Sequence, residues 1–284
     1  MKTNKSLLLA GLLSSAMLAS TGAYAAEDAS DVALEHPQHH QATAAPAAAE
    51  PASPHTLTAN VGLFGQYVFR GITYTNERPA LQGGFDYAHA SGFYAGVWGT
   101  NVDKDGLYGN TLEIDLYGGF ANTIGDTGIG YNVGVLQFYY PDNEKIAGQS
   151  ANTTELNAAV SWKWFTLKYN YAVTDFFGIN NVSMGDGKGD SKGSDYLELN
   201  FNYTMPYDIN LAAHVGHQTV EGRGYADYTD FLIGVNKNFS VAGSTGWNAG
   251  VNYTTSDASK RFWVDAAGNE TGDDHVILFL KRTF

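Results

Sequence analysis

Apolar and polar side chains alternate in segments of about ten residues throughout residues 56–284. Residues 196–203, for example, carry leucine, phenylalanine and tyrosine on one face of an extended chain, and tyrosine, glutamate and asparagine on the other. Residues 165–173 repeat the pattern, and Gly, Asn, Asp and Pro separate such segments. No stretch in this part of the chain has the helical period. The alternation predicts an all-β fold whose strands have one apolar and one polar face.

Twelve such segments lie approximately at residues 57–70, 79–89, 93–102, 111–122, 128–140, 153–162, 165–176, 195–204, 209–220, 229–239, 247–256 and 274–284. The connections between them are alternately long and short. Barrels of the bacterial outer membrane have short turns on the periplasmic side and long loops outside. An even number of strands also returns the C-terminus to the side of the N-terminus. We therefore predict a single closed antiparallel up-and-down transmembrane β-barrel of about 12 strands over residues 56–284.

The last ten residues form the strand expected to close this barrel. Val276, Leu278 and Leu280 share one face, and Phe284 ends it. A soluble domain rarely ends on such an apolar edge, but a closed barrel pairs its last strand with its first and leaves no edge in lipid. A terminal aromatic resembles the C-terminal signal of such barrels, although Arg282 holds a position that is usually apolar. We expect outer-membrane lipid and the barrel-assembly machinery among the partners.

Two segments of different composition precede the barrel. Residues 1–25 have the charged start, apolar core and small-residue cleavage pattern of a secretory signal peptide, which predicts export to the bacterial outer membrane. Residues 26–55 are rich in Ala, Pro and His without periodicity, and they predict a disordered periplasmic arm. Its histidines have no spacing that sets a coordination geometry, so we expect a solvated linker. The chain has no cysteine, and no disulfide framework is expected.

The polar faces of the strands are expected to line the interior. About eight strands already give a packed barrel, so about twelve leave room for water, where charged groups cost less than in lipid. Arg70 and Asp86 fall on the inward phase of neighbouring strands and would form an ion pair; alternatively, Arg70 lies at the outer rim in water. The candidate pore-lining residues are Arg70, Asp86, Glu113, Asp115, Glu155, Lys168, Glu198, Asn200 and Asn202.

Aromatic residues gather near the ends of the predicted strands. Membrane barrels have two girdles of aromatic side chains at the membrane–water interfaces. We expect the following rings to lie in these girdles: Tyr67, Phe69, Phe138, Tyr139, Tyr140, Trp162, Trp164, Phe165, Tyr203, Tyr207, Phe239 and Phe284.

Three short stretches near the start of the barrel resemble a known family. They are YVFRGIT at residues 67–73, PALQGGFDYAH at residues 79–89 and SGFYAGVW at residues 91–98. They are similar to the first three strands of the TorF family, whose members are proposed to be porins and were long described as conserved proteins of unknown function. The resemblance covers residues 56–284 and is strongest in these stretches. It implies an outer-membrane channel and brings no catalytic or binding residues with it.

Few residues point to catalysis or to metal binding. His89 and Ser91 have the spacing of the catalytic pair in twelve-stranded outer-membrane phospholipases, but they fall in a turn on the predicted periplasmic side, away from the outer leaflet. His214 and His217 point to opposite faces of a strand and cannot share a metal. The acidic loop at residues 186–195 has spacing suited to Ca²⁺, but it lacks the closing Glu and carries two lysines. We expect no catalytic residue, no metal site and no cofactor.

Together these features predict a passive porin for small hydrophilic solutes or ions. The net charge of −13 argues against a nucleic-acid partner, and the acids on the inner face predict a mild preference for cations. The alternative is a structural or adhesive barrel whose long outer loops bind a partner while the lumen is plugged. The loop at residues 177–194 discriminates between them, according to whether it folds into the lumen or stands clear. Neither the solute nor the oligomeric state follows from the sequence.

Overall fold

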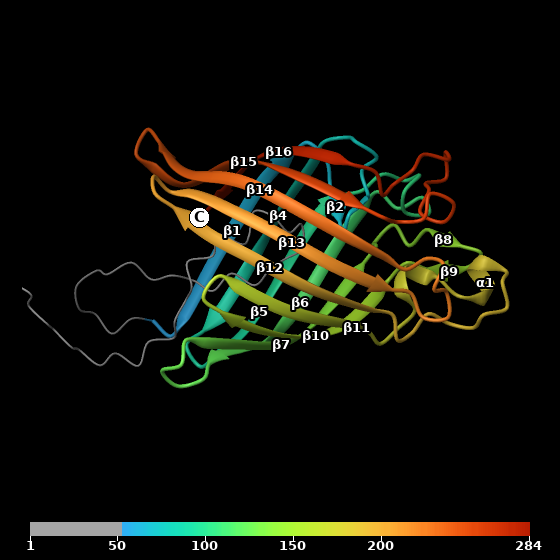
Figure 1. Cartoon of the computed structure of the whole chain (residues 1–284), viewed down its shortest axis with the longest axis horizontal. Helices are drawn as coiled ribbons and strands as arrows, with labels where there is room; N and C mark the ends of the chain where they lie inside the picture. The colour runs from blue at the N-terminus through green and yellow to red at the C-terminus, as the bar shows by residue number, and fades with distance from the viewer. Residues whose placement is uncertain (1–52) are drawn as a thin grey trace, which may run out of the picture.

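The computed structural model describes residues 53–284, so the predicted signal peptide and nearly all of the predicted arm lie outside the described residues. The described chain forms the predicted closed barrel of twelve antiparallel strands (Figure 1). These strands are β1 (His55–Phe64), β4 (Ala80–His89), β5 (Phe93–Asn101), β6 (Leu112–Thr123), β7 (Ile129–Tyr139), β10 (Thr153–Trp162), β11 (Phe165–Ala172), β12 (Asp195–Met205), β13 (Ile209–Thr219), β14 (Tyr228–Val241), β15 (Ser244–Ser256) and β16 (His275–Thr283). None of the helices in residues 53–284 is long and apolar enough to cross a membrane.

The two terminal strands close the barrel. β1 pairs with β4 on one side and with β16 on the other, and both pairings are antiparallel. In the closing seam, Phe64 lies opposite Phe279, and the Phe284 amide donates to the Ala59 carbonyl at 2.8 Å. Every wall strand therefore has a neighbour on each side, and the sheet has no open edge. The predicted pairing of the last strand with the first is confirmed.

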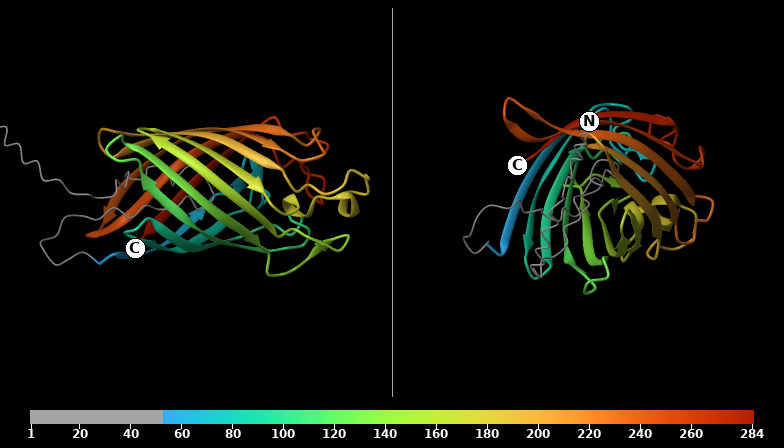
Figure 2. Two further views of the ribbon diagram at one scale, coloured as in Figure 1. Left: turned by 90° about the horizontal axis from the view of Figure 1, so that it is seen from below. Right: turned by 60° about the vertical axis from the view of Figure 1, so that its left-hand side comes forward.

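The connections alternate in length around the barrel, as predicted. The long ones span residues 65–79, 102–111, 140–152, 173–194, 220–227 and 257–274, and the short ones span residues 90–92, 124–128, 163–164, 206–208 and 242–243. A small hairpin, β8 (Lys145–Ile146) and β9 (Gln149–Ser150), lies in one long loop, and the short helix α1 (Asn181–Met184) lies in another. Figure 2 shows the long loops at one end of the barrel and the C-terminus at the other.

The wall has apolar side chains outside and polar side chains inside. On β12, Leu197 and Leu199 are 48% and 42% exposed, whereas Glu198 and Asn200 are 5% and 3% exposed. The neighbouring strands repeat this arrangement, with exposed leucine, valine and aromatic side chains on their outer faces. A water-soluble protein does not expose so many large apolar side chains together. The apolar phase of the strands therefore lies on the outside, as expected for a barrel in lipid.

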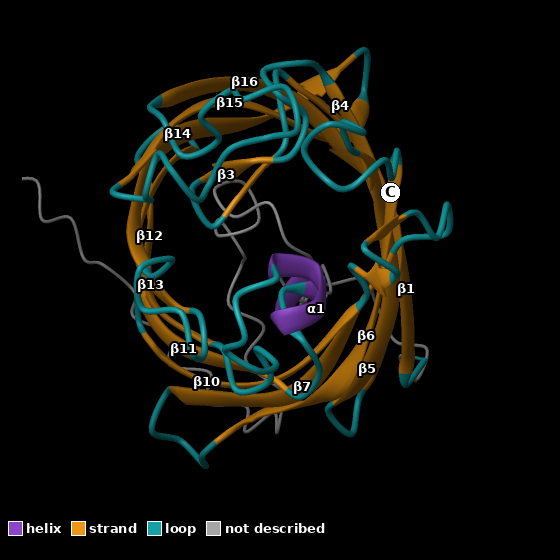
Figure 3. Cartoon of the chain, turned by 90° about the vertical axis from the view of Figure 1, so that its right-hand side faces the viewer, coloured by secondary structure: helices purple, strands orange, loops and turns teal. Residues whose placement is uncertain are grey.

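The first strand is shorter than predicted. It ends at Phe64 rather than at Arg70, and residues 65–79, which we call the strap, leave the wall and enter the barrel. The strap contains a second small hairpin, β2 (Val68–Phe69) and β3 (Ile72–Thr73), and Figure 3 shows β3 inside the ring of wall strands.

A tight turn shapes the strap. Its two central residues, Arg70 and Gly71, have φ of 50° and 75°. Positive φ at both positions matches the twist of a two-residue hairpin. The alternation of Tyr67 and Phe69 continues that of β1, so the sequence pattern does not mark the point where the wall ends.

Candidate functional site: the barrel interior and its strap

The strap reaches across the interior to the opposite wall. The Arg70 guanidinium donates to both carboxylate oxygens of Glu155 on β10, at 2.9 and 2.7 Å, and to Gln218 on β13 at 2.9 Å. It also lies 4.2 Å from the centre of the Tyr196 ring on β12. Counted around the barrel, β11 is the sixth strand from β1 in both directions, and β10 and β12 flank it. Arg70 therefore contacts the wall opposite the strand from which the strap departs.

Both predictions for Arg70 are wrong. Asp86 is not its partner, because Asp86 accepts a hydrogen bond from the Tyr117 hydroxyl instead. Arg70 does not lie in water at the rim either, since its side chain is only 5% exposed. The turn in the strap carries Arg70 away from the wall formed by β1 and β4. It brings Arg70 to Glu155 and Gln218, which lie 85 and 148 positions later in the chain.

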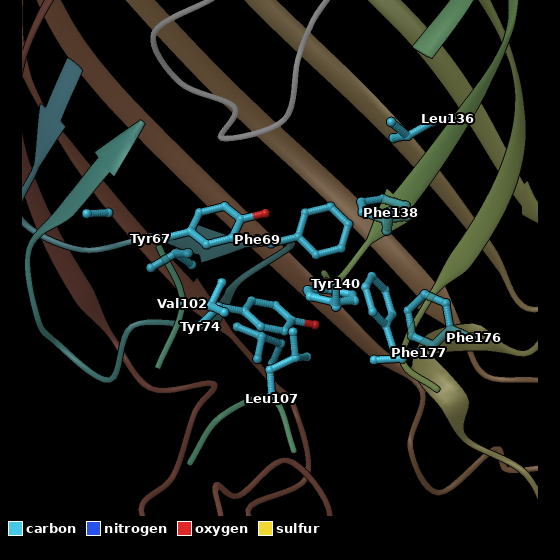
Figure 4. Packing of buried hydrophobic residues seen from close by; sticks show 14 of the residues in the cluster. Tyr67, Phe69, Tyr74, Val102, Leu107, Leu136, Phe138, Tyr140, Phe176 and Phe177 are labelled. Atoms are coloured by element: carbon cyan, nitrogen blue, oxygen red, sulfur yellow. The ribbon is translucent and has the colours of Figure 1, made fainter. Parts of the chain in front are cut away.

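Aromatic rings pack where the strap meets the far wall (Figure 4). The centroid of the Phe69 ring lies 5.7 Å from that of Phe138 and 6.0 Å from that of Phe177. Phe177 lies in turn 5.1 Å from Phe138 and 6.1 Å from Tyr74 of the strap. These separations are typical of favourable aromatic pairs. Apolar packing therefore holds the strap in addition to the ion pair of Arg70.

This packing corrects part of the predicted aromatic girdles. Tyr67, Phe69, Phe138 and Tyr140 are all buried, and none lies on the outer face. Proximity to a strand end does not reveal the phase of a side chain, and the inward phase of β7 carries Phe138 toward the strap. The other rings of the predicted set are exposed: Tyr139, Trp162, Trp164, Phe165, Tyr203, Tyr207, Phe239 and Phe284.

The longest loop, residues 173–194, is buried at its base, which consists of residues 176–180 together with Ser191 and Ser194. Phe176 and Phe177 in the 3₁₀ turn η2 (Phe176–Gly178) are buried, whereas α1 has no buried residue. Figure 3 shows α1 in front of the barrel mouth. The loop 177–194 therefore combines both predicted possibilities, because its base contacts the strap and its tip stands clear.

An ion pair holds the tip of this loop to its neighbour. Asp186 accepts hydrogen bonds from Arg223 Nε and Nη2 at 2.9 and 3.0 Å, and Arg223 is fully buried. Desolvation raises the pKa of Asp186, but hydrogen bonds from the Lys188 amide and from Arg223 outweigh it, and the net pKa is lowered. With Arg223 on its carboxylate, Asp186 is not arranged as a calcium ligand.

The predicted acids of β6 and β10 gather on the inner face beside the strap. Glu113 and Asp115 are both buried on the inner face of β6. Glu113 accepts hydrogen bonds from the hydroxyls of Tyr67, at 2.7 Å, and Tyr140. Glu155 is paired with Arg70. The cation beside Glu155 and the hydroxyls beside Glu113 give these two carboxylates different surroundings.

The remaining predicted pore-lining residues form a second group, on β11 and β12. Lys168 Nζ lies 3.7 Å from Glu198, and Asn200 donates to Glu198 at 3.1 Å. Asn202 follows on the same phase of β12. Asp86 stands apart on β4 with Tyr117. Apart from Arg70, which lies on the strap, the predicted residues are on the inner wall, where they are divided among separate contacts.

A buried network around His214 does not follow from the sequence pattern. His214 Nε2 lies 2.7 Å from the Tyr196 hydroxyl and 3.0 Å from Asp230, and Nδ1 lies 2.8 Å from Asn200. His217 is exposed on the opposite face, as predicted for residues three apart on a strand. Since Arg70 stacks on Tyr196, this network continues the contact between the strap and the wall. In the sequence, the only sign of this network is that His214 falls on the inward phase of its strand.

The His89–Ser91 pair lies apart from this interior. His89 Nδ1 lies 2.7 Å from Ser91 Oγ and accepts a hydrogen bond from the Ser91 amide at 3.1 Å. This contact closes the short turn 90–92, at the end of the barrel that holds the C-terminus. Within residues 53–284, no group of three or more His, Cys, Asp and Glu side chains is arranged to hold a metal ion.

Comparison with known proteins identifies a family and several barrels. The profile of a family described as "Bacterial protein of unknown function (Gcw_chp)" matches residues 48–284. No curated protein matches the sequence. Among solved structures, the KdgM porin in complex with disordered oligogalacturonate is similar with a TM-score of 0.49 and 8% identity, over 80% of this chain and 99% of that chain. The NanC porin has a TM-score of 0.46 and 10% identity, over 81% and 99% of the two chains. OccAB1 of Acinetobacter baumannii has a TM-score of 0.42 and 11% identity, over 83% and 66%.

Proposed function

We propose that this chain, which belongs to the Gcw_chp family of bacterial proteins of unknown function, is a porin-type channel of the bacterial outer membrane. It lets small hydrophilic solutes or ions diffuse passively. The observation that carries the proposal is the closed barrel with apolar side chains outside and polar side chains inside. Lipid solvates such an exterior favourably, and the closed sheet leaves no backbone group unpaired in the hydrocarbon layer.

The topology supports one orientation in the membrane. The start of β1, the C-terminus and all short turns lie at one end, which we assign to the periplasm. The long loops then face outward. The final strand, ending at Phe284, would present the signal that the barrel-assembly machinery recognises. Residues 1–25 would supply the export signal that this placement requires.

The strap makes the channel selective rather than wide. It crosses from β1 to the wall around β11 and places Arg70 and several aromatic rings in the path of a solute. Its contacts with Glu155 and Phe138 hold it at a defined position. We infer that the narrowest part of the channel lies at the strap.

The inner face of β6 favours cations at this point. Glu113 and Asp115 lie on it, and the partners of Glu113 are hydroxyl groups rather than cations. A carboxylate beside a channel with low-dielectric walls attracts cations and repels anions. The pairing of Arg70 with Glu155, and of Lys168 with Glu198, reduces the net field elsewhere. We therefore propose a mild cation preference.

Single-channel recording in planar bilayers tests the proposal. The purified chain should produce discrete conductance steps, and protein denatured by heat in the same detergent should not. A folded barrel that produces no steps under any applied voltage would overturn the proposal.

One observation favours a second function, a structural or adhesive barrel with a plugged lumen. The long loops bind one another over the mouth: the Thr73 amide donates to Thr271, the Asp103 amide to Tyr74 and the Ala266 amide to Asp105, each at 2.7 Å. Such a network would present a stable outer surface to a partner. The same recordings discriminate between the two functions, because an adhesive barrel with a plugged lumen should be electrically silent.

We propose no enzymatic activity for this barrel. Lipid hydrolysis is the check: the rate measured with the native protein should not change in Ser91→Ala.

A further inference from the structure

Basic and aromatic side chains form a patch on the outer face of the barrel, at the end that holds the C-terminus. The patch consists of Lys237 and Phe239 on β14, Trp247 on β15, and Arg282 and Phe284 at the end of β16. In the sheet, Phe239 lies opposite Trp247, and Trp247 lies opposite Arg282. All five share the outward phase with exposed Val235, Val251 and Leu280. They therefore face the lipid in the proposed orientation.

Arg282 lies between two rings of this patch. Its guanidinium carbon is 5.2 Å from the centre of the Trp247 ring and 4.4 Å from that of Phe284. Cation–π contacts of this kind hold a guanidinium in place and leave its charge uncompensated. The position is the one at which the C-terminal signal usually has an apolar residue, so the charge is not explained by barrel assembly.

Most hydrogen-bonding capacity of Arg282 is unused. A guanidinium has five N–H donors, and the contact to Ser244 Oγ at 2.5 Å uses one of them. Arg282 Nε and the neighbouring Trp247 Nε1 are buried atoms without a hydrogen-bond acceptor among the described residues, so an external ligand would meet the Nη groups of Arg282 first. Among the described residues, no Asp or Glu carboxylate lies within 4.0 Å of the charged nitrogens of Arg282 or Lys237, so neither forms an ion pair with one. The terminal carboxylate of Phe284 accepts a hydrogen bond from the Ala59 amide and forms no ion pair with Arg282 within 4.0 Å.

Lys237 adds a second uncompensated positive charge. It lies two residues before Phe239 on β14, farther from the C-terminal end of the barrel, with its side chain on the exposed outer phase. A lysine in that position extends its ammonium group toward the nearest polar interface. The ammonium group of Lys237 would then extend past Trp247 toward Arg282. The outer phases of the flanking strands β13 and β1 carry no Asp or Glu. The nearest acid along the chain is Asp208, in the turn before Ile209, which lies opposite Lys237, and it forms no ion pair with Lys237 within 4.0 Å. Arg282 and Lys237 are therefore both available to an anion.

We propose that this patch binds the phosphate of a glycerophospholipid in the periplasm-facing leaflet. Arg282 and Lys237 would donate to the phosphate oxygens, while the rings of Trp247 and Phe284 pack on the glycerol and the first part of the acyl chains. Guanidinium groups match phosphate geometry, and indole rings favour the headgroup level. The inference rests on the membrane placement proposed above and does not depend on conduction.

Native mass spectrometry of the purified barrel in detergent tests the inference. Phosphatidylglycerol is added to the native protein, with diacylglycerol of the same chains as the control for apolar binding. One phosphatidylglycerol should remain bound, and diacylglycerol should not. Arg282→Gln should reduce the bound-to-free ratio about tenfold, as expected for the loss of one charge-assisted hydrogen bond, and Lys237→Gln should also reduce it.

Lys163 provides a matched control at the same end of the barrel. Its ammonium lies 4.4 Å from the centre of the Trp162 ring, in the short turn between β10 and β11. Lys163→Gln should leave lipid binding unchanged. An equal loss with Lys163→Gln, or no loss with Arg282→Gln and Lys237→Gln, would overturn the inference. If Arg282→Gln does not give the folded band on an unheated gel, Lys237→Gln alone decides.

Competition with inorganic phosphate distinguishes a site for a lipid headgroup from a site for free phosphate. A lipid site should retain phosphatidylglycerol in the presence of excess phosphate, because the acyl chains contribute to binding. Displacement by phosphate alone would assign the patch to free anions and overturn the lipid assignment. A protein that is electrically silent but binds the lipid through Arg282 would contradict the proposed channel and leave this site intact.

Discussion

At the residue scale, three buried carboxylates inside the barrel each have partners of a different kind. Glu155 has Arg70, Glu198 has Lys168, and Glu113 has the hydroxyls of two tyrosines. Removing one member of a buried pair leaves the other without compensation, which costs more than removing both. The outer face follows a different rule, because lipid offers no compensation to a charge there.

Arginine substitutions on adjacent residues of β12 test these two environments. Leu199→Arg places a charge on the apolar outer face and should destabilise the barrel by about 2–4 kcal/mol if the residue lies near the bilayer midplane. Asn200→Arg should cost less, because the new charge points inward, close to Glu198. Unfolding by urea in lipid vesicles, followed by gel mobility, measures both. Equal losses would show that the inner and outer faces are assigned wrongly.

At the scale of the element, the strap is the segment that crosses the interior of the barrel. Its hairpin fits closely against the wall, since a Cβ added to Gly71 would lie 2.6 Å from the Asp230 Cβ. The ion pair of Arg70 and the ring packing of Phe69 hold it on the side opposite its origin. Tyr67 and Thr73 are held separately, by hydrogen bonds to Glu113 and Thr271. Loss of the ion pair should therefore free the tip of the hairpin from the far wall while the two ends of the strap stay in place.

Arg70→Gln should release the strap and raise the single-channel conductance. Breaking a buried pair costs about 3–5 kcal/mol, which is enough to populate a strap detached from the far wall. Arg78 is the control, because it belongs to the same strap and pairs with Asp103, but its side chain is 65% exposed. Arg78→Gln should change stability by no more than about 1 kcal/mol and leave the conductance unchanged. A conductance that rises equally in both variants would show that the Arg70 contact does not set the channel width.

The loop that carries α1 should loosen in acid. The pKa of Asp186 is lowered in the folded protein, so its contact with Arg223 stabilises the loop above the ordinary aspartate pKa of about 4. That contribution is lost as the pH falls through the lower folded-state pKa. Proteolysis of the loop by pepsin, an acid-active protease, should therefore accelerate over this pH window. In Asp186→Asn the cleavage rate should already be high and should change little, whereas Asp190→Asn should behave like the native chain.

At the scale of the whole molecule, acidic side chains outnumber basic ones, and under the proposed function the acids inside the barrel should have the largest effect on a passing ion. The net charge is −13, but the pairs formed by Arg70 and Lys168 remove part of the internal field. Beside the strap, the inner face of β6 adds Asp115 and Glu113, and Glu113 has hydroxyl groups rather than a cation as its partners. Selectivity should therefore depend on this one strand more than on the total charge.

Replacing both acids of β6 should weaken the cation preference. In a KCl gradient the native channel should give a reversal potential of the sign expected for cations, and Glu113→Gln with Asp115→Asn should move it toward zero. The native preference should decline as the salt rises past about 0.1 M, where the screening length is about 10 Å. An anion preference in the native channel, or no shift in the double variant, would show that these carboxylates do not set selectivity.

The sequence by itself determined the wall of this barrel. Strand positions, the two faces, the alternating connections and the closing role of the last strand all follow from a period of two residues and from the placement of turn residues. These are local properties, because each strand must satisfy the same two solvents along its own length. For that reason Leu199 and Asn200 could be assigned to opposite faces without knowledge of their neighbours.

Only the tertiary structure decided what lies inside. Tyr67 and Phe69 continue the alternation of β1, and an inward strap and an outward strand end have the same local pattern. The difference arises from contacts with residues far along the chain, such as Arg70 with Glu155 and Phe69 with Phe138. The charge of Arg70 is accommodated once a carboxylate on the opposite wall lies within reach, and closure of the barrel creates that proximity. The interior of this barrel is therefore a property of the closed ring rather than of any single strand.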